Sequence, residues 1–330
     1  MTNYAIQQVI NALSAGSLYA LMAVGLAMVF GILRLINFAH GDLMMIAAYL
    51  AVFSLGANLP LPAAVVVMVV GTVAVGLLME RIAYRPVRGA PDVAVLLTSF
   101  AVGQVLQNGT LLATRLAGKP TLIAFPSPAA LSGVVSGRDF AFLGDLTISR
   151  VNVVSFVAGI VLLGLLTLFV TRTTLGLSMR AAAEDLSAAR LVGIKVDRVV
   201  AAAFAIGSAL AAVAGLLYAA QAGQINPYIG FTPVLKAFIA AVIGGFGSIA
   251  GAVLGGYVLG FLEVLVTALA GIGDILPPGS VSPEVRALLQ QVLPGSLASW
   301  RDAIVFVVLI LVLLVRPQGI LGRRNREDTI

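Results

Sequence analysis

The chain has 330 residues, of which 60% are hydrophobic and only 10% are charged. Soluble domains carry about 25% charged residues, so this composition excludes a soluble globular protein. The net charge is +6, yet it does not indicate nucleic-acid binding, because 12 of the 20 basic residues lie in three patches: Arg81–Arg88, Arg172–Arg198 and Arg316–Arg326. Such patches are typical of the cytoplasmic loops of membrane proteins. With no cysteine and one histidine, disulfides and a histidine–cysteine metal site are excluded.

Apolar runs near or above the roughly 18 residues that span a bilayer recur along the chain. The runs are continuous rather than alternating, which favours helices over a membrane barrel. We therefore predict an all-α fold, a polytopic transmembrane helix bundle in one domain (1–330), with about eight spanning helices plus one half-helix. The spanning helices are predicted at 10–33, 37–56, 61–79, 93–114, 151–171, 199–221, 250–270 and 302–315, and the half-helix at 237–246.

The basic patches orient these segments. With the patches inside, the N-terminus lies outside, and 10–33 is predicted to be a retained helix rather than a signal peptide, since Arg34 is the first basic residue. Residues 115–150 and 271–299 become extracytoplasmic loops. The half-helix is predicted to dip into the membrane from the outer side, to break at a glycine-rich stretch, and to continue as a return helix.

Glycines recur in this return segment. Gly247, Gly251 and Gly255 are spaced four residues apart, which predicts close helix packing. The break itself contains Gly244, Gly245 and Gly247. These glycines are also candidates for lining the translocation pathway.

The stretch "LINFAHGDLM" places Asn37, His40 and Asp42 between two apolar runs. An acidic residue in the membrane costs about 2.5–3.5 kcal/mol on insertion scales, so it is expected to face a cavity, a partner or an interface. Two interpretations remain open. One is a tight cytoplasmic turn in which Asp42 caps the next helix, and the other is a discontinuous helix that lines a permeation path.

A repeated spacing supports the discontinuous helix. Ile36-Asn37 is followed by a glycine at position 41, and Ile225-Asn226 is followed by one at position 230, each after a long apolar helix.

Glu263 lies well inside another apolar run. Its carboxyl group is expected either to be hydrogen-bonded within the bundle or to serve gating or coupling, so it is also a pathway candidate.

The stretch Arg180–Lys195 is too short and too charged to span a membrane. It predicts a cytoplasmic helix with one apolar side, which either rests on lipid or docks a soluble partner. The chain lacks the phosphate-binding pattern G-x-x-x-x-G-K-[ST]. It is therefore either a passive channel or a protein whose energy comes from a separate subunit. A membrane-embedded enzyme has little support, because no cluster of His, Asp and Glu has catalytic spacing.

Several blocks carry a resemblance to a known family. In order along the chain they are "INFAHGD", "ERIAYRPVRGAP", "RAAAEDLSAARLVGIKVDRV", "INPYIGF", "KAFIAAVIGGFGSIAGAVLGG" and "RPQGILG". Together they resemble the LivH-type permease of branched-chain amino-acid ABC transporters, and they cover nearly the whole chain.

The resemblance implies a type II ABC importer permease fold in the bacterial inner membrane. It also implies a complex with a second homologous permease, two ATP-binding subunits and an extracytoplasmic solute-binding protein, and no cofactor in this chain. By the match, residues 172–198 form a cytoplasmic coupling loop to which Glu184, Asp185 and Gly193 belong.

The expected function is thus the permease subunit of an ATP-driven importer of branched-chain or related amino acids. The alternative is an autonomous channel or secondary carrier for a small polar solute such as urea or a short amide, since related urea and amide systems share these motifs. The stretch 271–299 departs from the family pattern by its length, which leaves the solute and the docking of a binding protein open.

Overall fold

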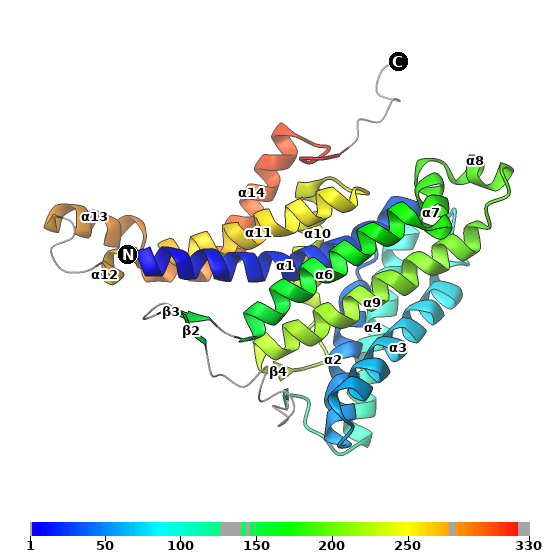
Figure 1. The fold of residues 1–330 in the computed structure, drawn as a ribbon, viewed down its shortest axis with the longest axis horizontal. Helices are drawn as coiled ribbons and strands as arrows, with labels where there is room; N and C mark the ends of the chain where they lie inside the picture. The colour runs from blue at the N-terminus through cyan, green and yellow to red at the C-terminus, as the bar shows by residue number, and fades with distance from the viewer. Residues whose placement is uncertain (1, 126–139, 143–145, 149, 277–281, 323–330) are drawn as a thin grey trace.

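In the computed structural model the described residues, 2–125, 140–142, 146–148, 150–276 and 282–322, form a bundle of helices (Figure 1). Within these residues, seven helices are long and apolar enough to cross a membrane. The predicted fold class, an all-α polytopic bundle, is confirmed.

The helices lie close to the predicted ranges. In chain order they are α1 (Thr2–Leu33), α2 (His40–Gly56), α3 (Leu61–Met79), the π-helical turn η1 (Glu80–Tyr84), α4 (Asp92–Leu116), α6 (Arg150–Arg172), α7 (Thr174–Glu184), α8 (Leu186–Leu191), α9 (Val196–Ala222), α10 (Phe231–Gly244), α11 (Ile249–Leu269), α12 (Ile272–Ile275), α13 (Pro283–Val292), the 3-10 helix η2 (Gly295–Trp300) and α14 (Arg301–Val315).

Four short strands join loops at one end of the bundle. β1 (Ile123–Ala124) pairs antiparallel with β4 (Gln224–Ile225), so that Ile123 lies opposite Ile225. β2 (Phe140–Phe142) pairs in the same way with β3 (Leu146–Ile148). The rest of the predicted outer loop 115–150 lies partly outside the described residues.

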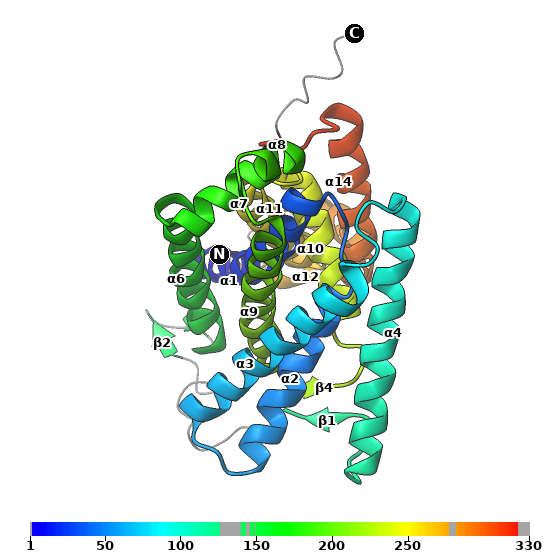
Figure 2. The ribbon, with the colours of Figure 1, turned by 90° about the vertical axis from the view of Figure 1, so that its right-hand side faces the viewer.

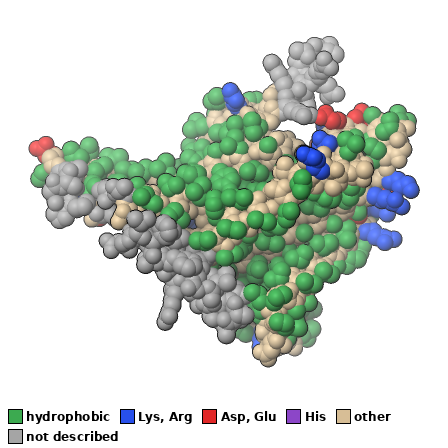
Figure 3. All heavy atoms as spheres, in the orientation of Figure 1, with side chains coloured by type: hydrophobic (Ala, Val, Ile, Leu, Met, Phe, Trp, Pro, Cys, Tyr) green, Lys and Arg blue, Asp and Glu red, His purple; other side chains and the backbone are tan. Residues whose placement is uncertain are grey.

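The basic side chains gather at the opposite end, which carries α7 and α8 (Figure 3). The N-terminus lies at the far end, where the Tyr4 hydroxyl donates to the Ala268 carbonyl at 2.9 Å. By the charge rule, we expect the end with α7 and α8 to be the cytoplasmic side.

Two helices, not one, are interrupted. The predicted span 37–56 begins as a helix only at His40, because the preceding residues form a turn inside the bundle. α2 has 17 residues and α10 has 14. At about 1.5 Å per residue, both are shorter than the roughly 30 Å hydrocarbon core.

The two short helices begin beside each other. A Cβ atom on Gly41 would collide with the carbonyl oxygen of Gly230, and one on Gly230 would collide with that of Gly41. The same turn precedes each glycine: the His40 N–H donates to the Asn37 carbonyl at 3.2 Å, and the Ile229 N–H to the Asn226 carbonyl at 3.1 Å. The repeated Ile-Asn spacing therefore marks two copies of one turn that meet in the interior.

The copies have opposite orientations. α1 runs toward the end with α7 and α8, whereas α9 runs away from it (Figure 1). Each is followed by the turn and then by a short helix that leaves the centre. This arrangement is the inverted repeat that is typical of transporters.

The glycine-rich break after α10 lies elsewhere than predicted. α10 starts in the interior and ends beside the C-terminal segment, where the Ile320 N–H donates to the Ile243 carbonyl at 2.8 Å and the Leu321 N–H to the Gly244 carbonyl at 2.9 Å. The C-terminal segment thus satisfies carbonyls that the last helical turn leaves unpaired. Because the break lies at the basic end, α11 then crosses the whole bundle.

The glycines of α11 pack closely, as predicted for Gly251 and Gly255, which lie against the backbone of Gly244 and Ala240 of α10. On another side of α11, Gly256 and Gly260 lie against the backbone of Ala20 and Gly16 of α1. Since burial of apolar surface does not draw helices together in lipid, close backbone approach is what stabilises these contacts.

The Gly41–Gly230 contact generates a prediction. Gly41→Ala should lower the free energy of unfolding by about 1–3 kcal/mol, because the methyl group overpacks the junction. Gly56→Ala, in the same helix, is the control, since a Cβ there meets no atom within 4 Å. The apparent melting temperature in detergent measures both, and equal values for the two variants would refute a tight junction.

Candidate functional site

The start of α2 gathers three of the predicted pathway residues. Asn37 is 1% exposed, and its Oδ1 accepts a hydrogen bond from the Tyr84 hydroxyl at 2.6 Å. The Asp42 Oδ1 accepts one from the Gln107 Nε2 at 2.8 Å. The interpretation of Asp42 as a helix cap is therefore wrong, because its carboxylate faces α4 and no side chain caps α2.

His40, the first residue of α2, is fully enclosed. Its ring lies against Gly25 of α1, and among the described residues its Nε2 has no hydrogen-bond partner. Gly25 in turn faces Gly207 of α9, so that the ring fits at the crossing of the two long helices. His40 thus packs against the helices that precede both turns.

Tyr84 connects this turn to the first turn of α9. It terminates η1, and the loop that follows is held by two ion pairs to Asp197 in the first turn of α9, from Arg85 at 2.5 Å and from Arg88 at 2.6 Å. Arg88 also pairs with Glu80. Tyr84 is not among the predicted site residues, although it lies within the block "ERIAYRPVRGAP".

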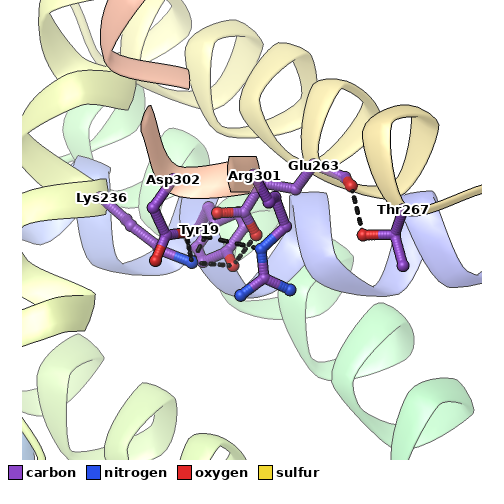
Figure 4. Close-up of polar contacts among 6 residues, drawn as sticks. All are labelled: Tyr19, Lys236, Glu263, Thr267, Arg301 and Asp302. Carbon is purple, nitrogen blue, oxygen red and sulfur yellow. Dashed lines mark hydrogen bonds and ion pairs between the residues drawn. The ribbon is translucent and has the colours of Figure 1, made fainter. Parts of the chain in front are cut away.

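Glu263 belongs to a second polar cluster (Figure 4). Its carboxylate pairs with Lys236 of α10 at 2.5 Å and accepts a hydrogen bond from the Tyr19 hydroxyl of α1 at 2.5 Å. Lys236 also lies 3.3 Å from Asp302, which lies 3.4 Å from Arg301. The cluster holds two cations and two anions, so their charges cancel.

This cluster joins four elements. Lys236 lies on α10, Glu263 on α11, Tyr19 on α1 and Asp302 on α14. Lys236 and Glu263 have side chains that are 11% and 6% exposed, and such buried charges require partners of opposite sign. The sequence showed Glu263 but gave no sign of its partner, because Lys236 is 27 residues away in the chain.

The predicted helix Arg180–Lys195 is two helices, divided at Asp185. The Asp185 Oδ1 accepts hydrogen bonds from the N–H groups of Ala188 at 3.0 Å and Ser187 at 2.7 Å, and it thereby caps α8. These hydrogen bonds lower the pKa of the Asp185 carboxyl group. The cap is therefore fully formed above the ordinary aspartate pKa of about 3.9 and is lost as pH falls through the lowered value.

Gly193 ends α8 with φ +84°. The Gly193 N–H donates to the Arg190 carbonyl and the Ile194 N–H to the Ala189 carbonyl, both at 3.0 Å, which is the Schellman arrangement. Beside it, Leu191 and Val192 are 89% and 75% exposed. The loop thus presents an apolar tip at the end of α8, a helix whose start is capped by Asp185 and whose end is closed by Gly193. Glu184, the last residue of α7, lies directly before this helix.

The predicted site residues do not form one site. Asn37, His40 and Asp42 lie at the junction of the two short helices, Gly244, Gly245 and Gly247 form the α10–α11 turn, Glu263 lies in the charged cluster, and Glu184, Asp185 and Gly193 lie in the loop. Within the described part of the chain, no three His, Asp or Glu side chains gather as a metal site.

Comparison with known proteins identifies the family. The model of a family described as "Branched-chain amino acid transport system / permease component" matches residues 8–313. The chain belongs to this family. It is therefore a transport permease and a multi-pass membrane protein, in agreement with the long apolar helices.

Two curated relatives are similar over nearly their whole length. The high-affinity branched-chain amino acid permease BraD of Pseudomonas aeruginosa is 38% identical over 98% of this chain and 97% of its own. LivH of Escherichia coli K12 is 38% identical with the same coverage. The xylose permease XylH of E. coli is 40% identical over 28% of this chain and 25% of its own. No solved structure matches.

The charged cluster generates a prediction. Lys236→Met leaves the Glu263 carboxylate buried without a cation and should cost about 3–5 kcal/mol of stability. The double variant with Glu263→Gln should recover part of this loss, because no charge is then stranded. Asp302→Asn is the control, since the Asp302 side chain is 52% exposed and exposed pairs contribute at most about 1 kcal/mol.

Thermal unfolding in detergent gives the comparison. If the loss of stability in the double variant equals the sum of the losses in the two single variants, Lys236 and Glu263 do not stabilise the bundle as an ion pair.

Proposed function

We propose that this chain is the membrane-spanning permease subunit of an ATP-driven importer, and that it carries branched-chain or related amino acids across the bacterial inner membrane. One observation carries the proposal. The similarity to BraD and LivH, whose names state branched-chain amino acid transport, extends over 98% of the chain. The short match to a xylose permease indicates that part of the scaffold serves other solutes as well.

The energy comes from separate subunits in this proposal. The chain carries no phosphate-binding loop. The loop at 172–198 has the form of a docking element, since Leu191 and Val192 are exposed at its tip and Asp185 and Gly193 fix the two ends of α8. The proposed partners are a second homologous permease, two ATP-binding subunits and an extracytoplasmic solute-binding protein.

The junction of the short helices supports a pathway nearby. Transporters place solute sites where inverted repeats meet and helices are interrupted. Here the turns at 34–39 and 226–230 meet at Gly41 and Gly230, with Asn37 and Asp42 on one side. An autonomous channel or carrier for urea or a short amide is the alternative, and no relative described above supports it.

The solute is tested in proteoliposomes that contain the assembled transporter. We expect uptake of labelled leucine that requires ATP on the side of the ATP-binding subunits. Excess isoleucine or valine should compete with it, whereas urea, acetamide and xylose should not. Leucine uptake that continues without ATP, or competition by urea alone, would contradict the proposal.

The docking loop is tested by two substitutions at one position. A Cβ at Gly193 meets no atom of this chain within 4 Å, so within the permease the substitution acts through the backbone. A left-handed conformation costs about 1–2 kcal/mol for L-residues, although asparagine adopts it more readily. We expect Gly193→Val to abolish leucine uptake and binding-protein-stimulated ATP hydrolysis, while Gly193→Asn keeps both.

Expression and membrane insertion should be normal for the two variants, because position 193 lies outside the membrane spans. Normal uptake by Gly193→Val at normal expression would show that the shape of the loop end has no part in coupling.

A further inference from the structure

The segment between α11 and α14 contains the helix α13, which packs mainly against the short helix α12. Both lie at the end of the bundle away from α7 and α8, beyond the N-terminus of α1 (Figure 1). The local sequence starts α13. The Ser282 Oγ accepts a hydrogen bond from the Val285 N–H at 3.3 Å, and Pro283 is the first helical residue. A serine cap followed by proline is typical of helix starts.

α13 has three different sides. Val285, Leu288 and Val292 follow one another at intervals of three and four residues, a spacing that puts side chains on one face of a helix. All three are exposed, and Leu288 is 58% exposed. Glu284 and Gln291 share a second side, which is polar and also exposed. We call Val285, Leu288 and Val292 the apolar stripe.

The third side of α13 holds it to α12. The Arg286 Nη2 donates to the Leu276 carbonyl at 2.8 Å, and the Gln290 Nε2 donates to the Asp274 Oδ1 at 2.7 Å. A Cβ atom on Gly273 of α12 would collide with the Gln290 side chain, so the two helices are in close contact. These contacts set the rotation of α13 about its own axis, and they leave the apolar stripe exposed.

The same contacts set the depth of α13. The Gly271 N–H, just after α11, donates to the Leu293 carbonyl, just after α13, at 2.8 Å. The charged cluster holds Glu263 beside the start of α14 (Figure 4). From there α11 continues for six residues, about 9 Å, and α14 runs 15 residues, about 22 Å, to the basic end. The end of α13 thus lies about 30 Å from the basic end, where the hydrocarbon core of a bilayer meets the headgroups.

The surface of the bundle that faces lipid leads up to α13. α14 stands at the edge of the bundle (Figure 1, Figure 2), and Val307, Ile310 and Leu314 are exposed on it. Trp300, directly before α14, is 63% exposed. Tryptophan is enriched at membrane–water interfaces, so this side chain is a second mark of the boundary near α13.

We propose that α13 rests on the bilayer surface at this end of the bundle, with the apolar stripe inserted among phospholipid headgroups and the upper parts of the acyl chains. A helix with one apolar and one polar side lies in the interface in this way. α13 carries one acidic and one basic side chain, so this contact needs no anionic lipid. The proposal requires only that the chain spans a membrane, and it depends neither on the solute nor on the source of energy.

A lipid surface fits the stripe better than a protein partner does. Burial of an aliphatic side chain contributes about 1.5–3 kcal/mol at about 25 cal/mol per Å², so three of them amount to at most about 360 Å². Each partner in a stable protein interface buries about 800 Å². The stripe is too small to hold a partner protein by itself. A helix that is already fixed to α12 has only its exposed side chains to place, and the bilayer boundary takes them.

Spin labelling tests the proposal. The chain has no cysteine, so Leu288→Cys and Gln291→Cys each introduce one nitroxide, on the apolar and on the polar side of α13. Val307→Cys on α14 is the reference for lipid. The full-length chain is reconstituted with its co-purifying subunits in nanodiscs of phosphatidylcholine. Electron paramagnetic resonance then measures collisions of each label with oxygen, which concentrates in lipid, and with a water-soluble nickel chelate.

We expect the ratio of oxygen to nickel collisions at position 288 to exceed the ratio at position 291 several-fold and to approach the ratio at position 307. Val292→Cys, on the same side as Leu288, should give the same result and guards against a local disturbance by one label. Equal ratios at 288 and 291 would place both sides in water and overturn the proposal. A water-like ratio at 288 that gives way to protection from both reagents when a solute-binding protein is added would make the stripe a protein docking surface, and would equally overturn it.

Discussion

The contact between Gly41 and Gly230 is the constraint on which the rest of the bundle depends. It brings two turns together in the interior, where water is not available to satisfy the backbone. Each turn satisfies part of its own backbone, since the His40 and Ile229 N–H groups donate to carbonyls three residues earlier. A side chain on either glycine would separate the two turns, and with them the starts of α2 and α10. The long helices α1 and α9 then cross at Gly25 and Gly207, with the His40 ring beside them.

Much of this fold is predictable from the apolar runs, because a helix that faces lipid must be apolar over most of its length. The predicted ranges 61–79 and 93–114 lie within or at the bounds of α3 and α4. The start of α2 was not predictable in this way. The turn residues before His40 are themselves largely apolar, so hydropathy gives no sign that the helix is interrupted there. Only the repeated Ile-Asn spacing indicated it.

The site residues likewise divide into those whose partners are near in sequence and those whose partners are distant. Asp185 and Gly193 act through neighbours two or three positions away, so local rules for helix ends account for them. The interactions of Glu263 with Tyr19 and Lys236 connect parts of the chain that are 244 and 27 residues apart. The α10–α11 break was placed wrongly for the same reason, because the segment that pairs with it comes from the C-terminal end. Periodicity and spacing describe one element at a time and carry no information on which elements meet.

The treatment of polar groups distinguishes the inside of this permease from its outer faces. Lys236, Glu263 and Asp302 neutralise one another, and the Asp42 carboxylate has its carboxamide donor. The exposed threonines of α6 bond their own helix. Two of these interactions also join elements that are separate in the chain. The Lys236–Glu263 pair joins α10 to α11, and the hydrogen bond from Gln107 to Asp42 joins α4 to α2. Because a buried charge or carboxylate in the membrane needs such a partner, these interactions fix which helices lie side by side.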